Sequence, residues 1–289
     1  MQTSTSDLIL RVARWFRSRE ITDAVVGYSG GVDSATTALL LHAAGVAVHL
    51  VVCDAPNQSY SSPMGGHAGG NTFGQVAEAK SLTYVKLPFC FYHGKPDQEK
   101  AANEAALPIQ RVAAYYAKAA ELRVLGKKTV VVGTVNFSEA AFLGFWGKAS
   151  DAAQDVYLIS HLTKTEVYAL ARDLDVPEVI LNAEPSGDLL FSKTNDRKMI
   201  GASYDKIDAI IQVAEHCGNM DVNYELRCGD LPMDDVQIFA DNIVRNGFKY
   251  DLPFPGFHID DRLEQFRKES YPMMHHIACQ IAQRKIASA

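Results

Sequence analysis

Residues 27–35 read GYSGGVDSA, a run that places two hydroxyl side chains, two adjacent glycines and a carboxylate close together. The run follows the apolar segment 24–26 and precedes an apolar helical segment, so the pattern predicts a buried strand, a tight turn and a helix. Such a turn points several backbone N–H groups at one spot, at the positive end of the helix, and phosphate binds there. Ser29 and Ser34 add hydroxyl donors, and the Asp33 carboxylate is a ligand type that divalent cations take.

The order of residues in this loop separates it from two common phosphate loops. No Lys follows the turn, which excludes a Walker A loop, and the glycine spacing does not match the dinucleotide fingerprint G-x-G-x-x-G. The pattern S-G-G-x-D-S resembles the pyrophosphate loop (PP-loop) of the N-type ATP pyrophosphatases, which split ATP between its α- and β-phosphates. The alternative is a plain strand–turn–helix corner in which the glycines supply positive φ angles.

The composition indicates a globular protein with a sizeable core. The chain has 289 residues, of which 47% are hydrophobic, and its net charge is −6. No basic run is interleaved with aromatic residues, so we expect no nucleic-acid partner. We expect no signal peptide and no membrane partner, and the five Cys form no C-x-x-C pair, so the prediction is a reduced cytoplasmic protein. Residues 1–215 are expected to form the main domain, and residues 216–289 a helical and loop extension packed on it.

The alternation of buried strands and helical patterns predicts an α/β fold. Strands are expected at 23–28, 46–53, 84–87 and 129–133, and helices at 6–20, 33–44, 72–80 and 98–124. This order predicts a doubly wound, mostly parallel sheet with helices on both faces, similar to the adenine nucleotide alpha hydrolases. Because ligands bind at the carboxyl ends of such strands, the loops 29–34, 54–59 and 134–139 should face one cleft.

Further motifs follow the loop in a fixed order. They are GTVNFSE at 133–139, LTKTEV at 162–167, EPSGDL at 184–189 and DRKMIGASYDKID at 196–208. Within the second of these, Thr163 and Glu166 form a T-x-x-E capping box, which predicts that a helix begins here. The joint order and spacing of these motifs, over about residues 5–210, resemble the ammonia-dependent NAD synthetases.

The resemblance implies a function for each matching position. Asp33 and Glu139 would bind Mg²⁺ against the pyrophosphate, and Asp33, Lys164 and Asp196 would be catalytic. ATP would be held by Ser29, Gly30, Gly31, Asp33, Ser34, Thr134, Lys164 and Ser186. The acceptor would be contacted by Arg111, Lys148, Asp151 and Asp155. Asp196 has a second explanation, as the acid that begins a helix before Met199.

The family consists of ATP-dependent ligases. The resemblance implies that ATP adenylates the carboxylate of deamido-NAD with release of pyrophosphate, and that ammonia then displaces AMP to give NAD. Glutamine-dependent relatives carry an amidase domain before the PP-loop, and only 28 residues precede Ser29 here, so free ammonia is the expected nitrogen source. Members of the family typically form homodimers, and we expect a homodimer here.

Several positions depart from the family pattern. Val135 stands in place of an Asp, Ile109 in place of the first Arg of the acceptor helix, and Arg197 in place of a Glu. Residues 149–153 lack most of the small and aromatic residues of the family's acceptor loop. Two alternatives therefore stay open: a ligase of the same superfamily that acts on a different carboxylate, and a non-catalytic module that binds adenine nucleotides.

Overall fold

A six-stranded parallel sheet forms the centre of the molecule. The computed structural model describes residues 4–54, 81–87, 92–144, 146–185, 195–218 and 256–269. The strands are β1 (Asp23–Gly27), β2 (Ala47–Asp54), β3 (Ser81–Lys86), β4 (Thr129–Gly133), β5 (Val156–Tyr157) and β6 (Phe257–His258). Their order is β3-β2-β1-β4-β5-β6, and each described pair is parallel. The chain moves outward from β1 to β3 and then returns to β4 on the other side of β1, so the switch point lies between β1 and β4.

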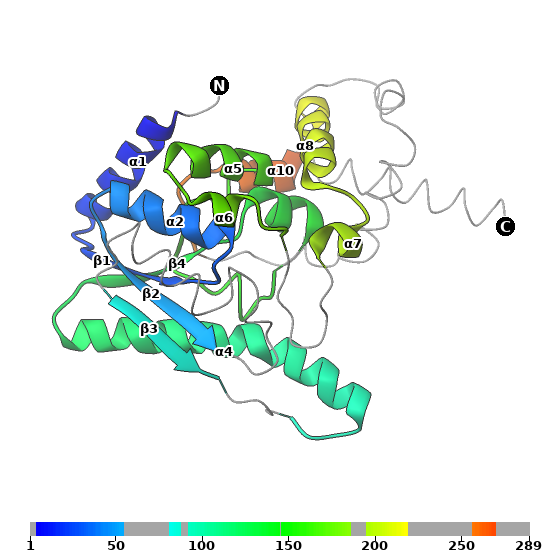
Figure 1. Ribbon diagram of the computed structural model, residues 1–289. Coiled ribbons are helices and arrows are strands. Elements are labelled where there is room, and N and C mark those ends of the chain that lie inside the picture. Colours follow the sequence, from blue (N-terminus) through cyan, green and yellow to red (C-terminus); the bar gives the residue numbers. More distant parts are fainter. Residues whose placement is uncertain are drawn as a thin grey trace, which may run out of the picture.

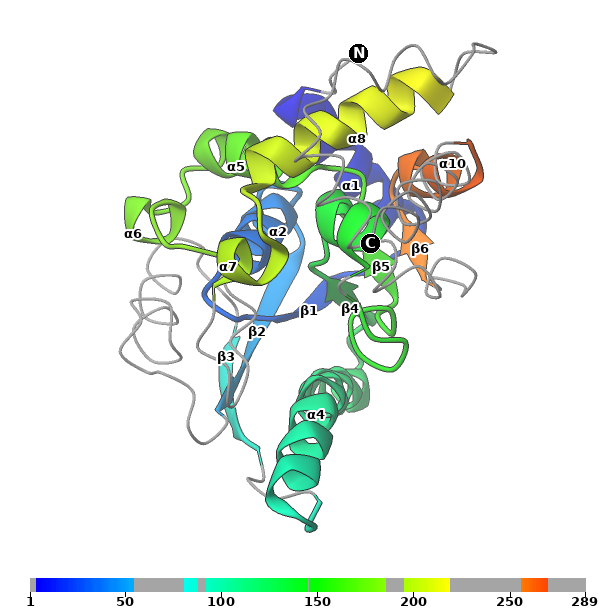
Figure 2. The same ribbon diagram turned by 90° about the vertical axis from the view of Figure 1, so that its right-hand side faces the viewer.

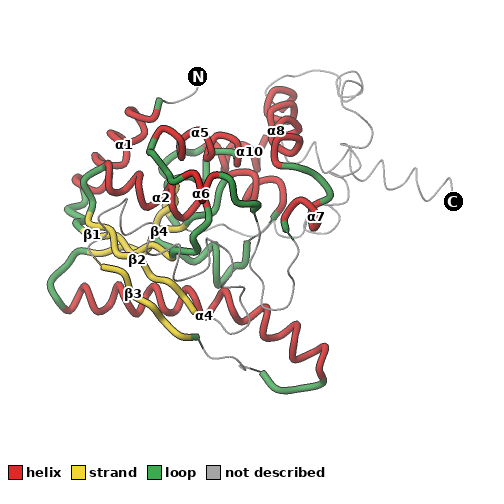
Figure 3. Tube along the Cα trace, viewed as in Figure 1, coloured by secondary structure: helices red, strands yellow, loops and turns green. Residues whose placement is uncertain are grey.

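Helices cover both faces of this sheet, which gives the three layers seen in Figures 1 and 3. They are α1 (Thr5–Ser18), α2 (Val32–Ala43), α4 (Pro96–Val124), α5 (Lys164–Asp173), α6 (Glu178–Leu181), α7 (Asp196–Ile200), α8 (Tyr204–Gly218) and α10 (Arg262–Glu269). The long helix α4 packs on β1, β2 and β4 from one side of the sheet. On the other side α2 packs on β1 and β2, and α1 and α5 pack against α2.

Two large apolar cores hold most of these layers together, and a smaller cluster that includes Val25, Ala119 and Val131 packs α4 on the sheet. The larger core lies between the sheet and helices α1, α2 and α5, and it includes Phe16, Leu40 and Leu50. The second core joins α8 and α10 to the π-helical turn η1 (Ser138–Leu143). Phe137 and Phe266 meet edge to face in it, with ring centroids 5.2 Å apart. Figure 2 shows α8 beside α5 and α10 beside β6, so the second core completes the β5–β6 end of the fold.

Two strand-end glycines allow aromatic rings to reach the backbone beside the switch point. A Cβ on Gly27 would lie 2.2 Å from the Tyr115 ring, and a Cβ on Gly133 would lie 2.3 Å from the Tyr157 ring. Real Cβ atoms do not approach other atoms so closely, so these rings pack where any other residue would place its side chain. The rings of Tyr115 and Tyr157 therefore lie directly against the backbone at the ends of β1 and β4.

The predicted α/β fold is confirmed, and the main strands and helices lie within a few residues of their expected positions. The elements that the sequence pattern did not predict are β5, β6 and η1. Each strand has only two residues, too short for a periodic pattern, and a single π-helical turn has no sequence signature of its own. The helix expected at 72–80 and the loop expected at 55–59 lie outside the described residues. The domain boundary at residue 216 stays a prediction, and β6 and α10 show that residues beyond it pack on the same sheet and core.

Candidate active site

The loop between β1 and α2 is a glycine turn that leaves the start of α2 without a side-chain cap. Gly30 has a φ of 81°, a conformation that favours glycine, and it turns the chain so that α2 begins at Val32. The N-cap of α2 is Gly31, and no side chain caps this helix end. Ser34 Oγ donates to the Gly31 carbonyl and lies 3.2 Å from Ser29 Oγ, so the two hydroxyls gather at the same turn. The first turn of α2 therefore directs unpaired N–H groups and the positive helix end outward, as the sequence predicted.

A buried lysine joins the two predicted metal carboxylates. Lys164 is only 3% exposed, and its Nζ donates to Asp33 Oδ2 at 2.5 Å and to Glu139 Oε1 at 3.0 Å. Asp33 comes from α2, Glu139 from η1 and Lys164 from the first position of α5. The capping box expected at Thr163 and Glu166 is present, so the start of α5 is set by local hydrogen bonds that aim Lys164 at the carboxylates.

The electrostatics of this triad follow from its burial. Burial raises the pKa of Glu139 to about 7; Asp33 and Asp196 act in the same direction, and Lys164 opposes them. Burial by itself lowers the pKa of Lys164, but the carboxylates of Asp33 and Glu139 outweigh it and hold that pKa above its ordinary value. Lys164 therefore stays protonated and balances part of the negative charge gathered around it.

A buried asparagine connects the carboxylate of Asp33 to the backbone of Glu139. Asn136 is fully buried, its Nδ2 donates to Asp33 Oδ1 at 3.1 Å, and its Oδ1 accepts from the backbone N–H of Glu139 at 3.0 Å. One side chain thus orients Asp33 and begins the turn that carries Glu139. The sequence motif 133–139 contained this residue, but no function was predicted for it.

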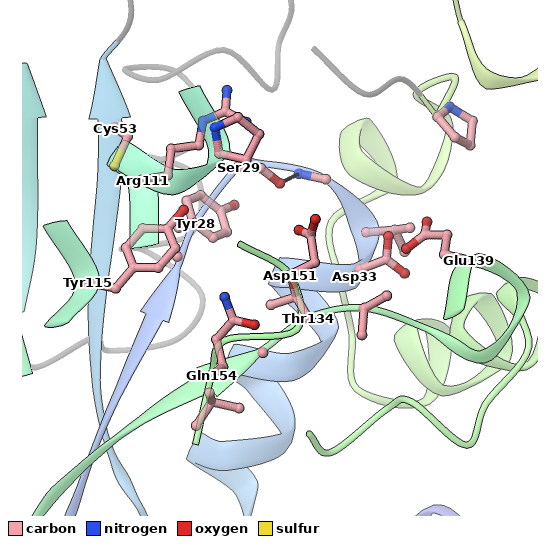
Figure 4. A pocket seen from close by; sticks show the side chains of 18 of the residues that line it. Tyr28, Ser29, Asp33, Cys53, Arg111, Tyr115, Thr134, Glu139, Asp151 and Gln154 are labelled. Atoms are coloured by element: carbon pink, nitrogen blue, oxygen red, sulfur yellow. Dashed lines mark hydrogen bonds between the residues drawn. The ribbon is translucent and has the colours of Figure 1, made fainter. Parts of the chain in front are cut away.

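The triad lies at the edge of a cavity of about 500 Å³ at the switch point. Figure 4 shows Asp33 and Glu139 on one side of it and Cys53, Arg111 and Tyr115 on the other, with Thr134, Asp151 and Gln154 between them. The loops after β1 and β4 both line this cavity, which confirms that they face one cleft. We refer below to the first side as the phosphate side and to the second as the acceptor side.

Asp196 closes the cavity from α7. Its residue is 7% exposed, it lines the cavity, and its Oδ2 accepts a hydrogen bond from the Tyr204 hydroxyl at 2.9 Å. The N-cap of α7 is Asn195, whose side chain accepts from Lys198 N, so capping does not require Asp196. Asp196 is thus both the first residue of a helix and a carboxylate turned into the cavity.

Comparison with known proteins agrees with this geometry. A family model described as NAD synthase matches residues 5–253. The chain belongs to the NAD synthase family. A protein of Alkaliphilus metalliredigens named NH(3)-dependent NAD(+) synthetase is 30% identical over 228 residues, which cover 71% of this chain and 85% of that protein.

Solved structures of the NAD synthase family share the fold. An NMN synthetase from Francisella tularensis superposes with a TM-score of 0.65 at 20% identity, over 87% of this chain and 98% of that one. An NH3-dependent NAD synthetase from Campylobacter jejuni gives a TM-score of 0.60 at 20% identity, over 86% and 96% of the two chains. At these identities the likeness is one of fold.

The residues that the family resemblance placed at the acceptor separate into two groups. Arg111 and Asp151 line the cavity. Lys148 is exposed and does not line it. The carboxylate of Asp155 accepts from Val131 N at 2.8 Å and from the Tyr116 hydroxyl at 2.9 Å, so it links α4 to β4. Ser186, expected at the ATP phosphates, lies outside the described residues.

The positions that depart from the family pattern also have clear locations. Val135 is buried, belongs to the second core and lines the cavity, so an apolar side chain suits its surroundings. Ile109 is 48% exposed on α4, one of the larger apolar side chains at the surface. Within the loop of residues 147–151, Asp151 accepts from Gly147 N and Ser150 Oγ, so the loop is closed on itself without the family's residues.

Sequence reasoning missed several cavity residues because no motif residue type marked them. Tyr28, Cys53, Tyr115 and Gln154 line the cavity, and burial raises the pKa of the Cys53 thiol to about 11, so it stays protonated. Tyr204 was within the motif 196–208, whose spacing puts it eight residues after Asp196, and that spacing was the available signal.

The two carboxylates suit a divalent cation. Asp33 and Glu139 already converge on one positive group, the Lys164 ammonium, at 2.5 and 3.0 Å. Among the described residues no group of three or more His, Cys, Asp or Glu side chains is placed to hold a metal ion. Mg²⁺ typically takes one or two protein carboxylates and completes its shell with phosphate oxygens and water, so a pair of carboxylates beside a phosphate loop fits it.

Proposed function

We propose that this chain is an ammonia-dependent NAD synthetase, a ligase that forms a carbon–nitrogen bond with ATP as co-substrate. The observation that carries the proposal is the meeting of the open loop 29–34 with Asp33, Glu139 and Lys164 at one edge of a single cavity. A module that only binds nucleotides needs no buried lysine between two carboxylates beside the phosphates. A ligase that expels pyrophosphate needs positive groups where charge develops.

The first step solves a leaving-group problem. A carboxylate does not exchange its oxygen for an amine at neutral pH because oxide would have to leave. Attack of the acceptor carboxylate on the α-phosphorus of ATP forms the acyl-adenylate and breaks the bond to the pyrophosphate. The N–H groups at the start of α2, the hydroxyls of Ser29 and Ser34 and the ammonium of Lys164 would stabilise the charge that grows on the departing pyrophosphate.

Asp33 and Glu139 would hold Mg²⁺ in this complex. When bound, the ion supplies neutralisation of phosphate charge, which complements the helix end and the lysine. The Lys164 ammonium, which lies beside both carboxylates, would contact a phosphate oxygen of ATP. Thr134, Gly30, Gly31 and Ser186 complete the proposed ATP site.

The second step is attack of ammonia on the acyl-adenylate. Nitrogen bonds to the acyl carbon, the bond to AMP breaks, and one proton leaves the nitrogen. Asp196 is the proposed acceptor of that proton, because it lines the cavity and lies close enough to the triad for its charge to raise the pKa of Glu139. Burial and the neighbouring carboxylates raise the pKa of Tyr204, so its hydroxyl remains a donor that orients Asp196.

The acceptor would lie along the other side of the cavity. Arg111 supplies the cationic group suited to the phosphates of a dinucleotide, and Asp151 and Gln154 supply hydrogen-bond acceptors and donors between the two sides. Lys148 and Asp155 remain proposed acceptor residues on the strength of the family pattern. No helix among the described residues has the length and apolarity to cross a membrane. We further propose a cytoplasmic homodimer, on the strength of the family resemblance.

The test is a direct product assay. Protein is incubated with Mg-ATP, ammonium and deamido-NAD, and NAD, AMP and pyrophosphate are measured by mass spectrometry. We expect the three products in equal amounts. A parallel reaction replaces deamido-NAD with nicotinic acid mononucleotide, the acid form of NMN, because one protein of the same fold is an NMN synthetase. Faster turnover of the mononucleotide would reassign the acceptor, and no AMP with either acid would refute the ligase.

A further inference from the structure

Residues of helix α8 interact with both ends of Lys164, the side-chain ammonium and the backbone. The helix packs on α5 and on η1, the two elements that carry Lys164 and Glu139. Tyr204 and Asp208 lie four residues apart at its start, so they share one face of the helix. The Tyr204 ring lies 5.1 Å from Lys164 Nζ, a distance at which an ammonium is attracted to an aromatic face.

Asp208 reaches the other end of the lysine residue through the backbone. It is 2% exposed, its Oδ1 accepts from Ser138 Oγ at 2.5 Å, and its Oδ2 accepts from Thr165 N at 2.8 Å. Ser138 Oγ in turn accepts from Lys164 N at 2.9 Å. Two successive N–H groups at the start of α5 therefore end, directly or through one hydroxyl, on a single buried carboxylate.

The network accounts for how a fully buried lysine keeps one position. Four bonds along a lysine side chain can rotate, so the ammonium is placed well only if the backbone that carries it is fixed. The capping box bonds the backbone N–H groups of Thr163 and Glu166, but it does not bond Lys164 N or Thr165 N. Those two N–H groups are held by Ser138 and Asp208.

We propose that Asp208 is a positioning residue for Lys164, acting through Ser138 and the first turn of α5, and that α8 thereby sets the geometry of the phosphate side. The proposal deepens the proposed function, because the position of Lys164 matters for turnover only if Lys164 contacts ATP. Asp208 does not itself line the cavity, so it touches neither substrate nor the reacting atoms.

The first test measures the position of Lys164 without turnover. Reductive methylation of the full-length protein without nucleotide is followed at Lys164 by peptide mass spectrometry. Asp208→Asn removes a carboxylate acceptor, and Ser138→Ala removes the hydroxyl that links Lys164 N to Asp208. In each variant Lys164 should be modified about tenfold faster than in the wild type. Asp205→Asn, an exposed carboxylate in the same turn of α8, should leave the rate unchanged. Because both variants break one network, the double variant should change the rate by less than the product of the single effects.

A general loss of stability must be separated from a loss of position. Ile211→Val removes one methylene group from the buried face of the same helix and touches none of these contacts. Ile211→Val should destabilise the protein and leave the modification of Lys164 at the wild-type rate. Faster modification in Ile211→Val, or wild-type rates in both Asp208→Asn and Ser138→Ala, would overturn the proposal.

The second test uses turnover and separates the two proposals. In Asp208→Asn, kcat should fall about tenfold, as expected for a residue behind a catalytic group, while KM for the acceptor stays within about twofold. If the wild type forms no AMP, the proposed function fails and the methylation result still decides the position of Lys164. If the wild type turns over and Asp208→Asn keeps its full kcat, the positioning proposal fails alone.

Discussion

The phosphate side and the acceptor side of the cavity differ in how their charged groups are held. On the phosphate side, Asp33, Glu139 and Lys164 are bonded to one another and backed by Asn136 and Asp208. Of the four predicted acceptor contacts, Arg111 and Asp151 line the cavity, and Lys148 and Asp155 do not. The charged groups of the phosphate side are thus bonded to one another, whereas Asp151 is held by neutral partners, Gly147 N and Ser150 Oγ.

The difference has a chemical reason. Charge develops on phosphate oxygens during the reaction, and donors that are already fixed stabilise it most because they need no rearrangement. An acceptor has only to be bound and aimed, and many arrangements of side chains do this. The departures from the family pattern at Ile109 and residues 149–153 lie on α4 and in the loop before β5, outside the hydrogen-bonded group of Asp33, Glu139 and Lys164.

The largest expected effect comes from the centre of the network. Asp33→Asn should lower kcat for AMP formation by about 10³-fold, because one substitution removes a metal ligand and a partner of Lys164. The measurement is AMP formation at saturating Mg-ATP, with Asp205→Asn as the control for loss of one exposed carboxylate. A loss smaller than tenfold would show that the phosphate side does not depend on the network.

A steric change at the border of the two sides should come next. Gly133→Ala places a methyl group against the fully buried ring of Tyr157, which has no room to move, and should lower the free energy of unfolding by about 3 kcal/mol. Denaturant unfolding measures this loss. Combining Gly133→Ala with Tyr157→Leu should give a smaller loss than the sum of the two, and simple additivity would contradict the contact.

The ionisation of Glu139 predicts a pH-dependent stability. Its pKa is about 7 in the folded protein and 4.5 in an ordinary glutamate, so the folded state holds the proton more tightly. Ionisation therefore lowers stability as pH rises from about 4.5 to about 7. Glutamine does not ionise, so Glu139→Gln does not lose this stability as pH rises. The free energy of unfolding of the variant minus that of the wild type should therefore increase by about 2–3 kcal/mol between pH 5 and pH 8.

This prediction is checked by denaturant unfolding across that range without added Mg²⁺. Glu121→Gln on the surface of α4 provides the matched comparison, since the side chain of Glu121 is 67% exposed. A difference between Glu139→Gln and wild type that stays constant with pH would mean that Glu139 is ionised in the folded state throughout.

The smallest effects should come from the acceptor side. Arg111→Lys keeps the charge but loses the planar pair of donors, and should raise KM for the acceptor about tenfold without changing KM for ATP. Arg123→Lys, on the same helix, should change neither constant. Steady-state kinetics with each substrate varied in turn separates the two cases. An equal rise in both KM values would show that the two sides are not independent.

Asp155→Asn then decides between two functions for one residue. The substitution removes one of the two hydrogen bonds that its carboxylate accepts and should lower the free energy of unfolding by about 1 kcal/mol. If KM for the acceptor rises as much as in Arg111→Lys, Asp155 also contacts the acceptor, as the family pattern predicts. An unchanged KM would leave Asp155 as a structural carboxylate.

Local features could be predicted from the sequence because short-range forces determine them. The turn at Gly30, the start of α2 and the capping box at Thr163 each depend on residues within one or two turns of chain. The parallel α/β sheet followed from the alternation of strands with helices. The family motifs also pointed to Asp33, Glu139 and Lys164 as neighbours in function.

Only the tertiary structure decided how these residues meet. Lys164 and Asp33 are 131 positions apart, and their contact depends on the register of β1 and β4 and on the packing of α5 against α2. From the sequence alone Lys164 could have been an exposed surface residue, but the structure buries it between two carboxylates. Asp155, by contrast, matched an acceptor motif and is held by the backbone of Val131. Composition and spacing determine which groups are available, whereas long-range packing determines which of them share one cavity and which hold the fold.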